Sequence, residues 1–222
     1  MTLTLDHVFV CTAVGAPEVQ ALLEAGFVEG SRNVHPGQGT ANRRFFFAHG
    51  FLEFLWVHDA TEATSPLTGP TRLWERWSQR GGLSHPFGIC FSSPSEADHP
   101  LPFASWAYEP AYLPKGKCIR FAEGASLSEP ELFALSWLQS PTTAAPQPRE
   151  HRLPLGAMRS VSVGLPDVAN LSAPMRAASE AGLLGVHASA SPELVVTFDS
   201  PEPIDFALPS LALKLSGRPV AV

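Results

Sequence analysis

Proline is the residue that most restricts how this chain can fold, because it occurs 22 times in 222 residues. That is about twice the usual proline content of roughly 5%. A proline inside a helix removes a backbone hydrogen bond and costs roughly 3 kcal/mol, so a coiled coil or a helical bundle is excluded. Only Pro17 and Pro36 fall within the first 60 residues. Regular secondary structure is therefore expected near the N-terminus, and irregular connections are expected later in the chain.

The overall composition narrows the fold and the function further. The chain is 45% hydrophobic and only 16% charged, so it has enough apolar surface to fold. A net charge of −6 argues against a nucleic-acid-binding surface, which needs clustered lysine and arginine. No apolar run approaches the roughly 20 residues of a membrane helix, no signal peptide is recognisable, and three scattered cysteines fit a reducing compartment. We expect a cytoplasmic α+β protein that binds neither nucleic acid nor membrane.

The first 60 residues have a regular pattern of short elements. Leu5 to Thr12 is apolar and β-branched, which predicts a buried strand. A helix is expected from Pro17, with a stop at Gly26. Phe27 to Arg32 is expected to be a short strand, and residues 43–48 and 51–57 to form a hairpin. The predicted order is strand, helix, strand, strand, strand.

The middle of the chain is less regular. A helix is expected over residues 70–80, followed by strands over 87–91, 117–122 and 131–138. Ser140 to Arg149 is rich in proline and poor in apolar bulk, which is typical of a linker.

After this linker the opening pattern returns, which suggests an internal duplication. Ala173-Pro174 begins a helix that ends Glu-Ala-Gly, as the first helix does, and the strand before it is centred on residues 161–163. Residues 194–198 are expected to correspond to the strand at 51–57. We therefore expect three regions in one compact unit: a first module (1–65), a connecting helix and proline-rich strand region (66–150), and a second, degenerate module (151–222).

Two polar residues stand inside apolar strands. Strand alternation places Phe51, Glu53 and Leu55 on one face. His7 is likewise flanked by apolar residues on its own face. An isolated buried carboxylate costs several kcal/mol unless it is paired or bound to metal. His7 and Glu53 are suitable ligands for Zn, Fe, Mn or Ni. A buried His–Glu hydrogen bond, or a solvent-facing Glu53, remains an alternative.

The segment from residue 33 to residue 44 is predicted to be a polar loop that lines the cleft. It is dense in side chains that bind anions or carbonyl groups, namely Asn33, His35, Gln38, Asn42, Arg43 and Arg44. We expect Asn33, His35, Asn42 and Arg43 to contact a substrate. The alternative is an ordinary connection with solvated arginines.

Aromatic residues offer a second kind of candidate. Trp106 and Tyr112, with Trp74, Trp77 and Tyr108, are expected to wall an apolar pocket, although most buried aromatic residues belong simply to the core. No glycine-rich phosphate loop and no nucleophile elbow is present, so dehydrogenases, nucleotide hydrolases and serine hydrolases have no support.

The segments LDHVFVC, EAGF, HPGQGTANRRFFF and FLEFLWVHD together resemble the glyoxalase/bleomycin-resistance/dioxygenase superfamily, also called vicinal oxygen chelate proteins. The closest likeness is to its bacterial glyoxalase-like branch. The resemblance implies paired βαβββ modules whose curved mixed sheets enclose a cleft. It also implies a divalent metal held by histidine and glutamate from the first and fourth strands of the modules.

In this resemblance, His7 and Glu53 match the metal ligands of the first module. The second module departs from the pattern, because Ser160 stands opposite His7 and Val195 opposite Glu53. If the second module instead begins at HPFGICF, His85 and Glu131 are the candidates.

The resemblance leaves two functions open. One is a metal-dependent lyase, isomerase or dioxygenase acting on a small oxygenated substrate, with Glu53 as metal ligand or general base. The other is a metal-free protein that sequesters a small molecule, as antibiotic-resistance members of the superfamily do. Either is compatible with a monomer or a homodimer.

Overall fold

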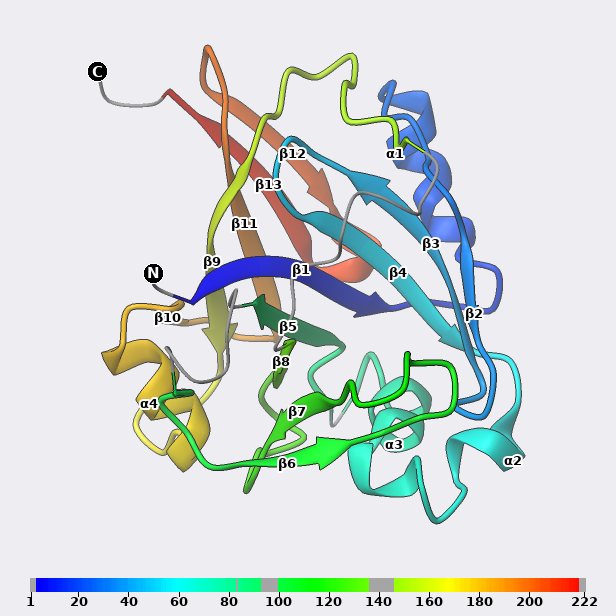
Figure 1. Cartoon of the computed structure of the whole chain (residues 1–222). Coiled ribbons are helices and arrows are strands. Elements are labelled where there is room, and N and C mark those ends of the chain that lie inside the picture. Colours follow the sequence, from blue (N-terminus) through cyan, green and yellow to red (C-terminus); the bar gives the residue numbers. More distant parts are fainter. Residues whose placement is uncertain (1–2, 83, 93–99, 136–145, 220–222) are drawn as a thin grey trace.

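The computed structural model describes residues 3–82, 84–92, 100–135 and 146–219, and within them the chain forms two curved mixed sheets (Figure 1). The strands of the first sheet are β1 (Thr4–Cys11), β2 (Asn33–His35), β3 (Thr40–Phe46), β4 (Phe51–Val57), β5 (Phe87–Ser92), β6 (Ser105–Tyr108), β7 (Ile119–Ala122) and β8 (Glu131–Leu135). Their order across the sheet is β2-β3-β4-β1-β5-β8-β7-β6.

The first sheet has approximate two-fold symmetry about its centre. β1 pairs in parallel with β4, and β5 pairs in parallel with β8. β1 and β5 are antiparallel to each other and lie side by side in the middle of the sheet. The paired βαβββ architecture expected from the sequence is confirmed in this arrangement.

The second sheet follows in the chain. Its strands are β9 (Met158–Leu165), β10 (Gly185–Ala188), β11 (Glu193–Asp199), β12 (Ile204–Leu208) and β13 (Leu213–Arg218), in the order β10-β9-β11-β13-β12.

The helices are short, as the proline content predicts. They are α1 (Gln20–Glu24), α2 (Ala60–Ala63), α3 (Leu73–Ser78) and α4 (Ala173–Glu180), with 3₁₀ turns η1 (Pro17–Val19), η2 (Gly69–Thr71) and η3 (Pro209–Leu211). Within the described residues, no helix is long and apolar enough to cross a membrane.

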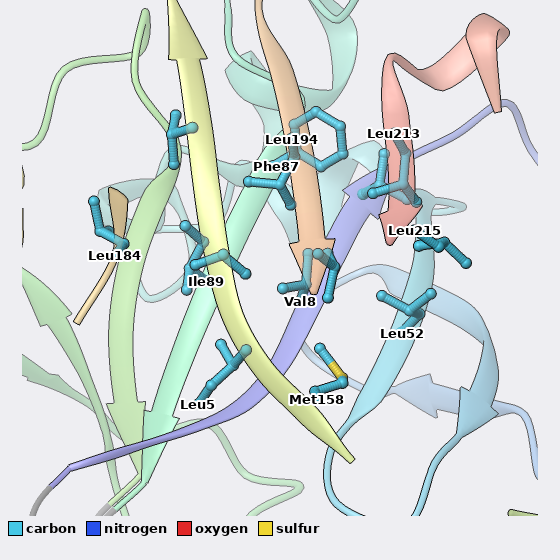
Figure 2. Close-up of a cluster of buried hydrophobic side chains, with 14 of the residues drawn as sticks. Leu5, Val8, Leu52, Phe87, Ile89, Met158, Leu184, Leu194, Leu213 and Leu215 are labelled. Carbon is cyan, nitrogen blue, oxygen red and sulfur yellow. The ribbon is translucent and has the colours of Figure 1, made fainter. Parts of the chain in front are cut away.

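The two sheets pack face to face through one apolar core. Along β1, β4 and β5, one set of alternating residues, including Val8, Leu52 and Ile89, points towards the second sheet. Figure 2 shows these side chains meeting Leu194 and Leu213 from β11 and β13. The other set points to the opposite face of the first sheet, where the polar residues of β1 and β4 also lie.

Two predicted strand assignments are wrong. Residues 27–32 are not a strand, because their backbone is bonded by side chains of a crossing segment: Val28 N–H donates to His151, and Ser31 N–H donates to Gln147. The strand instead falls at Asn33–His35, inside the predicted loop. The correspondence of residues 194–198 with 51–57 also fails, because β11 is antiparallel to β9 whereas β4 is parallel to β1.

The ends of two predicted elements lie outside the described residues. β8 ends at Leu135, and residues 136–138 of that predicted strand are not described. The same holds for residues 140–145 of the predicted linker.

Candidate functional site

A cavity of about 310 Å³ opens on the face of the first sheet that is turned away from the second sheet. Its polar lining residues are His7, Asn33, His35, Gln38, Asn42, Arg44, Glu53 and Tyr112. Its apolar lining residues are Phe9, Phe51, Leu55, Leu73, Leu113, Pro114, Ile119, Phe121, Phe133 and Leu135. This size is at the lower end of small-molecule pockets, which span roughly 300–1,000 Å³.

His7 and Glu53 meet inside this cavity, as the strand alternation predicts. Both side chains are buried, at 7% relative exposure each. His7 Nε2 lies 3.7 Å from Glu53 Oε2. This separation is too long for a hydrogen bond, whose usual limit is about 3.2 Å. The two atoms therefore face each other without bonding directly.

Asp6 fixes the orientation of the His7 ring. A β-bulge between Leu5 and His7 interrupts the pairing of β1 with β5. The Asp6 carboxylate then lies 2.6 Å from His7 Nδ1, although neighbours in a regular strand point to opposite faces. Burial opposes ionisation of Asp6, but the hydrogen bond and charge of His7 hold the Asp6 pKa below its usual value. The Asp6 carboxylate accepts the proton of Nδ1, so Nε2 is the ring nitrogen that is turned towards Glu53.

Asn42 fixes the orientation of Glu53. Its Nδ2 donates to Glu53 Oε1 at 2.6 Å, and its Oδ1 accepts from the backbone N–H of Asn33 at 2.8 Å. Because Oε1 is engaged in this way, Oε2 is the carboxylate oxygen left to face His7. Asn42 therefore lies in the cavity as expected, and it positions a candidate ligand.

A chain of hydrogen bonds closes one side of the cavity. Tyr112 donates its hydroxyl proton to Gln38 Oε1 at 2.8 Å, and Gln38 Nε2 donates to Thr40 Oγ1 at 2.8 Å. His35 Nδ1 lies 2.9 Å from the same Thr40 oxygen. Burial lowers the pKa of His35, with Glu53 opposing the shift. Near neutral pH, His35 is therefore an uncharged group in the lining.

Two residues predicted to bind substrate lie outside the cavity lining. Arg43 points to the other face of β3, where its guanidinium forms an ion pair with Glu29. Its neighbour Arg44 lines the cavity instead. Trp106 is half-exposed on the outermost strand β6 and stacks on Phe121, with ring centroids 5.4 Å apart. Because Trp106 and Phe121 are register partners on β6 and β7, Trp106 lies beside Phe121 on the same face, outside the cavity lining.

The symmetry of the first sheet shows which residues of its other half occupy the positions equivalent to His7 and Glu53. Phe9 pairs with Glu53 across β1 and β4, and Gly88 pairs with Glu131 across β5 and β8. Phe9 and Gly88 pair with each other, so Glu131 occupies the register position of Glu53. Two residues before Gly88, at the position of His7, the chain has Pro86.

The Glu131 carboxylate forms an ion pair with an arginine. Arg76 Nη2 lies 3.2 Å from Glu131 Oε2, and Arg76 Nη1 donates to the backbone oxygens of His85 and Glu129. Both side chains are almost fully buried. A fixed cationic side chain therefore neutralises the second carboxylate, and His85 meets the network only through its backbone.

Comparison with known proteins agrees with this architecture. A family profile described as glyoxalase-like domain matches residues 5–174. The chain belongs to the glyoxalase-like domain family. The superfamily resemblance seen in the sequence is thereby confirmed. A search of curated proteins finds no match to the chain.

Solved structures similar to this glyoxalase-like chain include three at low sequence identity. A hypothetical protein from Staphylococcus aureus aligns with a TM-score of 0.51 and 9% identity, covering 98% of this chain and 100% of that one. A hypothetical protein from Bacillus halodurans aligns with a TM-score of 0.40 and 15% identity, covering 65% of this chain and 99% of that one. A mutant of 4-hydroxymandelate synthase from Streptomyces coelicolor aligns with a TM-score of 0.45 and 14% identity, covering 96% of this chain and 62% of that one. The first supports the fold alone.

The donor atoms of the glyoxalase-like site fit a divalent metal ion. Imidazole nitrogen and carboxylate oxygen bind such ions at about 2.0–2.2 Å, so two ligands of one ion lie at most about 4.2 Å apart. The 3.7 Å between His7 Nε2 and Glu53 Oε2 satisfies this limit.

A second possible cluster is less suitable. Asp6, His7 and Cys90 have potential ligand atoms within 4.8 Å of one another. The Asp6–His7 contact is a hydrogen bond, however, and burial, with Asp6 and Glu53 nearby, raises the pKa of Cys90 well above its usual value. Because a metal needs the thiolate, this cluster is a poor site.

Two contributors escaped prediction from the glyoxalase-like sequence, and a third was named without being separated from its neighbour. Asp6 reaches His7 only because of a bulge, and no residue signals that bulge. Arg76 is distant in sequence from Glu131, so the ion pair appears only in three dimensions. Arg44 was named with its loop, and the one-residue ambiguity between it and Arg43 needed the register of β3 against β4 to resolve.

Proposed function

We propose that this protein is an enzyme that binds one divalent metal ion (Zn, Fe, Mn or Ni) through His7 and Glu53 and acts on a small oxygenated substrate in the cavity. The observation that carries the proposal is the approach of two potential metal-ligand atoms, His7 Nε2 and Glu53 Oε2, which lie 3.7 Å apart in the cavity. The reaction class is that of a lyase, isomerase or dioxygenase. Three cysteines without disulfides fit a cytoplasmic setting.

The residues around the pair have distinct roles in this proposal. A bound divalent ion supplies Lewis-acid polarisation of a substrate oxygen. Asp6 keeps the proton on His7 Nδ1, and Asn42 holds the Glu53 carboxylate in place. His35, uncharged near neutral pH, offers one ring nitrogen to the substrate. Glu53 Oε2, which faces the cavity, would also be placed to accept a proton from the substrate as general base.

Metal affinity of matched variants tests the proposal. Titration of chelator-treated protein with Zn²⁺, Mn²⁺, Ni²⁺ or Fe²⁺ should show one site per chain. Glu53→Gln should weaken that site by more than about 100-fold, because loss of an outer-shell partner alone costs about 10–100-fold.

Glu131→Gln is the matched control, because Glu131 occupies the equivalent register position but is paired with Arg76. It should leave metal affinity within a few-fold of the original. If the two variants behave alike, or if no metal binds, the metal assignment fails.

A second function, metal-free sequestration of a small molecule, is favoured by one specific observation. Arg76 neutralises Glu131, and Pro86 replaces the second histidine, so half of a symmetric ligand set is missing. In that case chelator-treated protein should gain thermal stability with small phenolics or 2-oxoaldehydes, and added metal should not increase the gain.

A further inference from the structure

Arg44 and Glu53 are directly opposite each other on β3 and β4, yet they do not form an ion pair. Their Cα atoms are register partners, and both side chains line the cavity. Directly opposed residues in an antiparallel pair have Cβ atoms roughly 4.5–5.5 Å apart, which places opposite charges within easy reach. Glu53 instead bonds to Asn42 and faces His7. Arg44 turns away to Ser31.

The charge of Arg44 is therefore not balanced by a direct partner. Its Nε donates to the Ser31 carbonyl at 2.8 Å, and its Nη2 donates to Ser31 Oγ at 2.7 Å. Both acceptors are neutral. Among the described residues, no carboxylate forms an ion pair with Arg44, whereas the adjacent Arg43 is paired with Glu29. A half-buried guanidinium with neutral partners, facing a cavity, favours an anionic ligand.

Aromatic rings connect Arg44 to the candidate metal ligand. The Arg44 guanidinium carbon lies 5.1 Å from the centroid of the Phe46 ring and 5.9 Å from that of Phe51. The Phe51 ring stacks on the His7 imidazole, with centroids 4.3 Å apart and planes inclined by 14°. The cation and the His7–Glu53 pair are therefore at two ends of one aromatic surface.

The rest of the cavity lining suits a flat apolar group. Phe121 and Phe133 lie nearly parallel, with centroids 5.4 Å apart. The Phe133 ring also meets the His7 ring edge-on at 5.5 Å. Aromatic rings prefer offset-stacked or edge-to-face partners at such distances. Phe51, His7, Phe133 and Phe121 thus lie in one row across the sheet, with the His7 ring between Phe51 and Phe133.

We propose that the cavity takes a small aromatic carboxylate, with its carboxylate bound by the Arg44 guanidinium and its ring beside the stacked Phe51 and His7 rings. This inference rests on the proposed function only in using the same cavity, and it names the substrate class. The small volume limits the ligand to one ring with short substituents.

Calorimetric titration with benzoate, benzamide and acetate tests the inference. Benzoate should bind at least about tenfold more tightly than benzamide, because its charged carboxylate can form paired, charge-assisted hydrogen bonds with the guanidinium and the neutral amide cannot. It should also bind at least about tenfold more tightly than acetate, which lacks the ring. In Arg44→Gln, benzoate affinity should fall by about tenfold or more while benzamide affinity changes little. Arg44→Lys, which keeps the charge but loses the planar fork, should be intermediate.

Equal affinities of the wild-type protein for benzoate and benzamide would overturn the inference without any variant. Equal losses of both ligands in Arg44→Gln would overturn it as well. Repeating the titrations in Glu53→Gln separates the two proposals. The Glu53→Gln protein should no longer hold metal. If it still prefers benzoate to benzamide, the anion site at Arg44 is supported independently of the metal site. A metal-binding protein that shows no such preference retains the proposed function and loses this inference.

Discussion

At the scale of single residues, the site depends on partners that fix each candidate ligand. Asp6 orients His7, and Asn42 orients Glu53, so each ligand has one polar atom engaged and one facing the other ligand. Outer-shell hydrogen bonds of this kind fix the tautomer of a histidine ligand and raise its basicity. The bulge in β1 therefore has a use, because it brings Asp6 to the same side as His7.

Asp6→Asn should weaken metal binding by about 10–100-fold without unfolding the protein. The amide can donate a proton to His7 Nδ1, and this favours the tautomer in which Nε2 carries the hydrogen and cannot bind metal. The measurement is the dissociation constant for Zn²⁺ by competition with a chromophoric chelator.

Asp205→Asn provides the control for that substitution. Asp205 is exposed and pairs with Arg218, far in sequence from His7. This variant should keep the wild-type affinity. An Asp6→Asn protein with unchanged affinity would mean that the tautomer of His7 is set by something other than Asp6.

Strand alternation alone identified the central pair of this site. His7 and Glu53 are each a polar residue in an apolar strand, and a period of two is enough to place them on one face. Arg44 could not be separated from Arg43 in this way, because both arginines lie in the same strand and either could face the cavity. Only the pairing of Arg44 with Glu53 across β3 and β4 decides between them.

At the scale of elements, the close approach of β1 and β5 sets the shape of the cavity floor. Gly88 lies opposite Phe9, and the Phe9 ring fills the space where a side chain on Gly88 would be. A Cβ at Gly88 would lie 2.0 Å from a ring carbon of Phe9. Phe9 lines the cavity, so the absence of a side chain at Gly88 leaves the space that its ring occupies.

Gly88→Ala should therefore destabilise the protein and change ligand binding together. Overpacking of a core typically costs about 1–3 kcal/mol. For a chain of this size, each kcal/mol lowers the melting temperature by roughly 2–4 °C. Calorimetry should show that fall, and benzoate affinity should decrease because the Phe9 ring is displaced.

Gly185→Ala is the matched control, since a Cβ there would meet Ser162 at an ordinary contact distance of 3.4 Å. Its melting temperature should stay close to that of the wild-type protein. A Gly88→Ala protein as stable as this control would show that Phe9 moves without cost.

The elements that sequence patterns predicted well are those with long apolar runs. β1, β4, β5 and β11 all fall where such runs were found. β2 was missed because three residues of an edge strand carry no hydrophobic alternation. The partner of each strand was harder to predict, because a parallel and an antiparallel neighbour have the same alternation. This is why β11 was matched with β4.

At the scale of the whole molecule, His85 lies buried near the junction of the two sheets. Its side chain is fully buried, and neither ring nitrogen makes a hydrogen bond of normal geometry with a described residue. Burial, together with the nearby Arg76 charge, lowers the pKa of His85 to about 3, and the Gly164 backbone of β9 opposes this shift. The folded protein therefore keeps this histidine neutral.

Stability should fall as the pH is lowered through this range. An unfolded chain binds a proton at His85 below about pH 6.5, whereas the folded chain does not until about pH 3. Above pH 6.5, His85 is neutral in both the folded and the unfolded chain, so it does not lower the stability. As the pH falls towards 3, only the unfolded chain binds the proton, and the free energy of unfolding decreases by a few kcal/mol. Urea unfolding at pH 7 and pH 4 should show the decrease, and His85→Leu should reduce the slope.

His58→Gln is the control for that measurement, because His58 is exposed and on the surface. Its stability should depend on pH as the wild-type protein does. If His85→Leu retains the full slope, other groups account for the acid sensitivity.

The central position of β1 has a consequence for how the molecule assembles. β1 precedes every other strand in sequence, yet both of its neighbours, β4 and β5, lie far along the chain. Contacts of such long range make folding slow, because loop closure comes before the stabilising pairing. Until residue 92 is available, an apolar strand stays open on at least one edge, and such edges promote association between unfinished chains. The half of the sheet that holds His7 therefore stays open to such association until β5 has been synthesised.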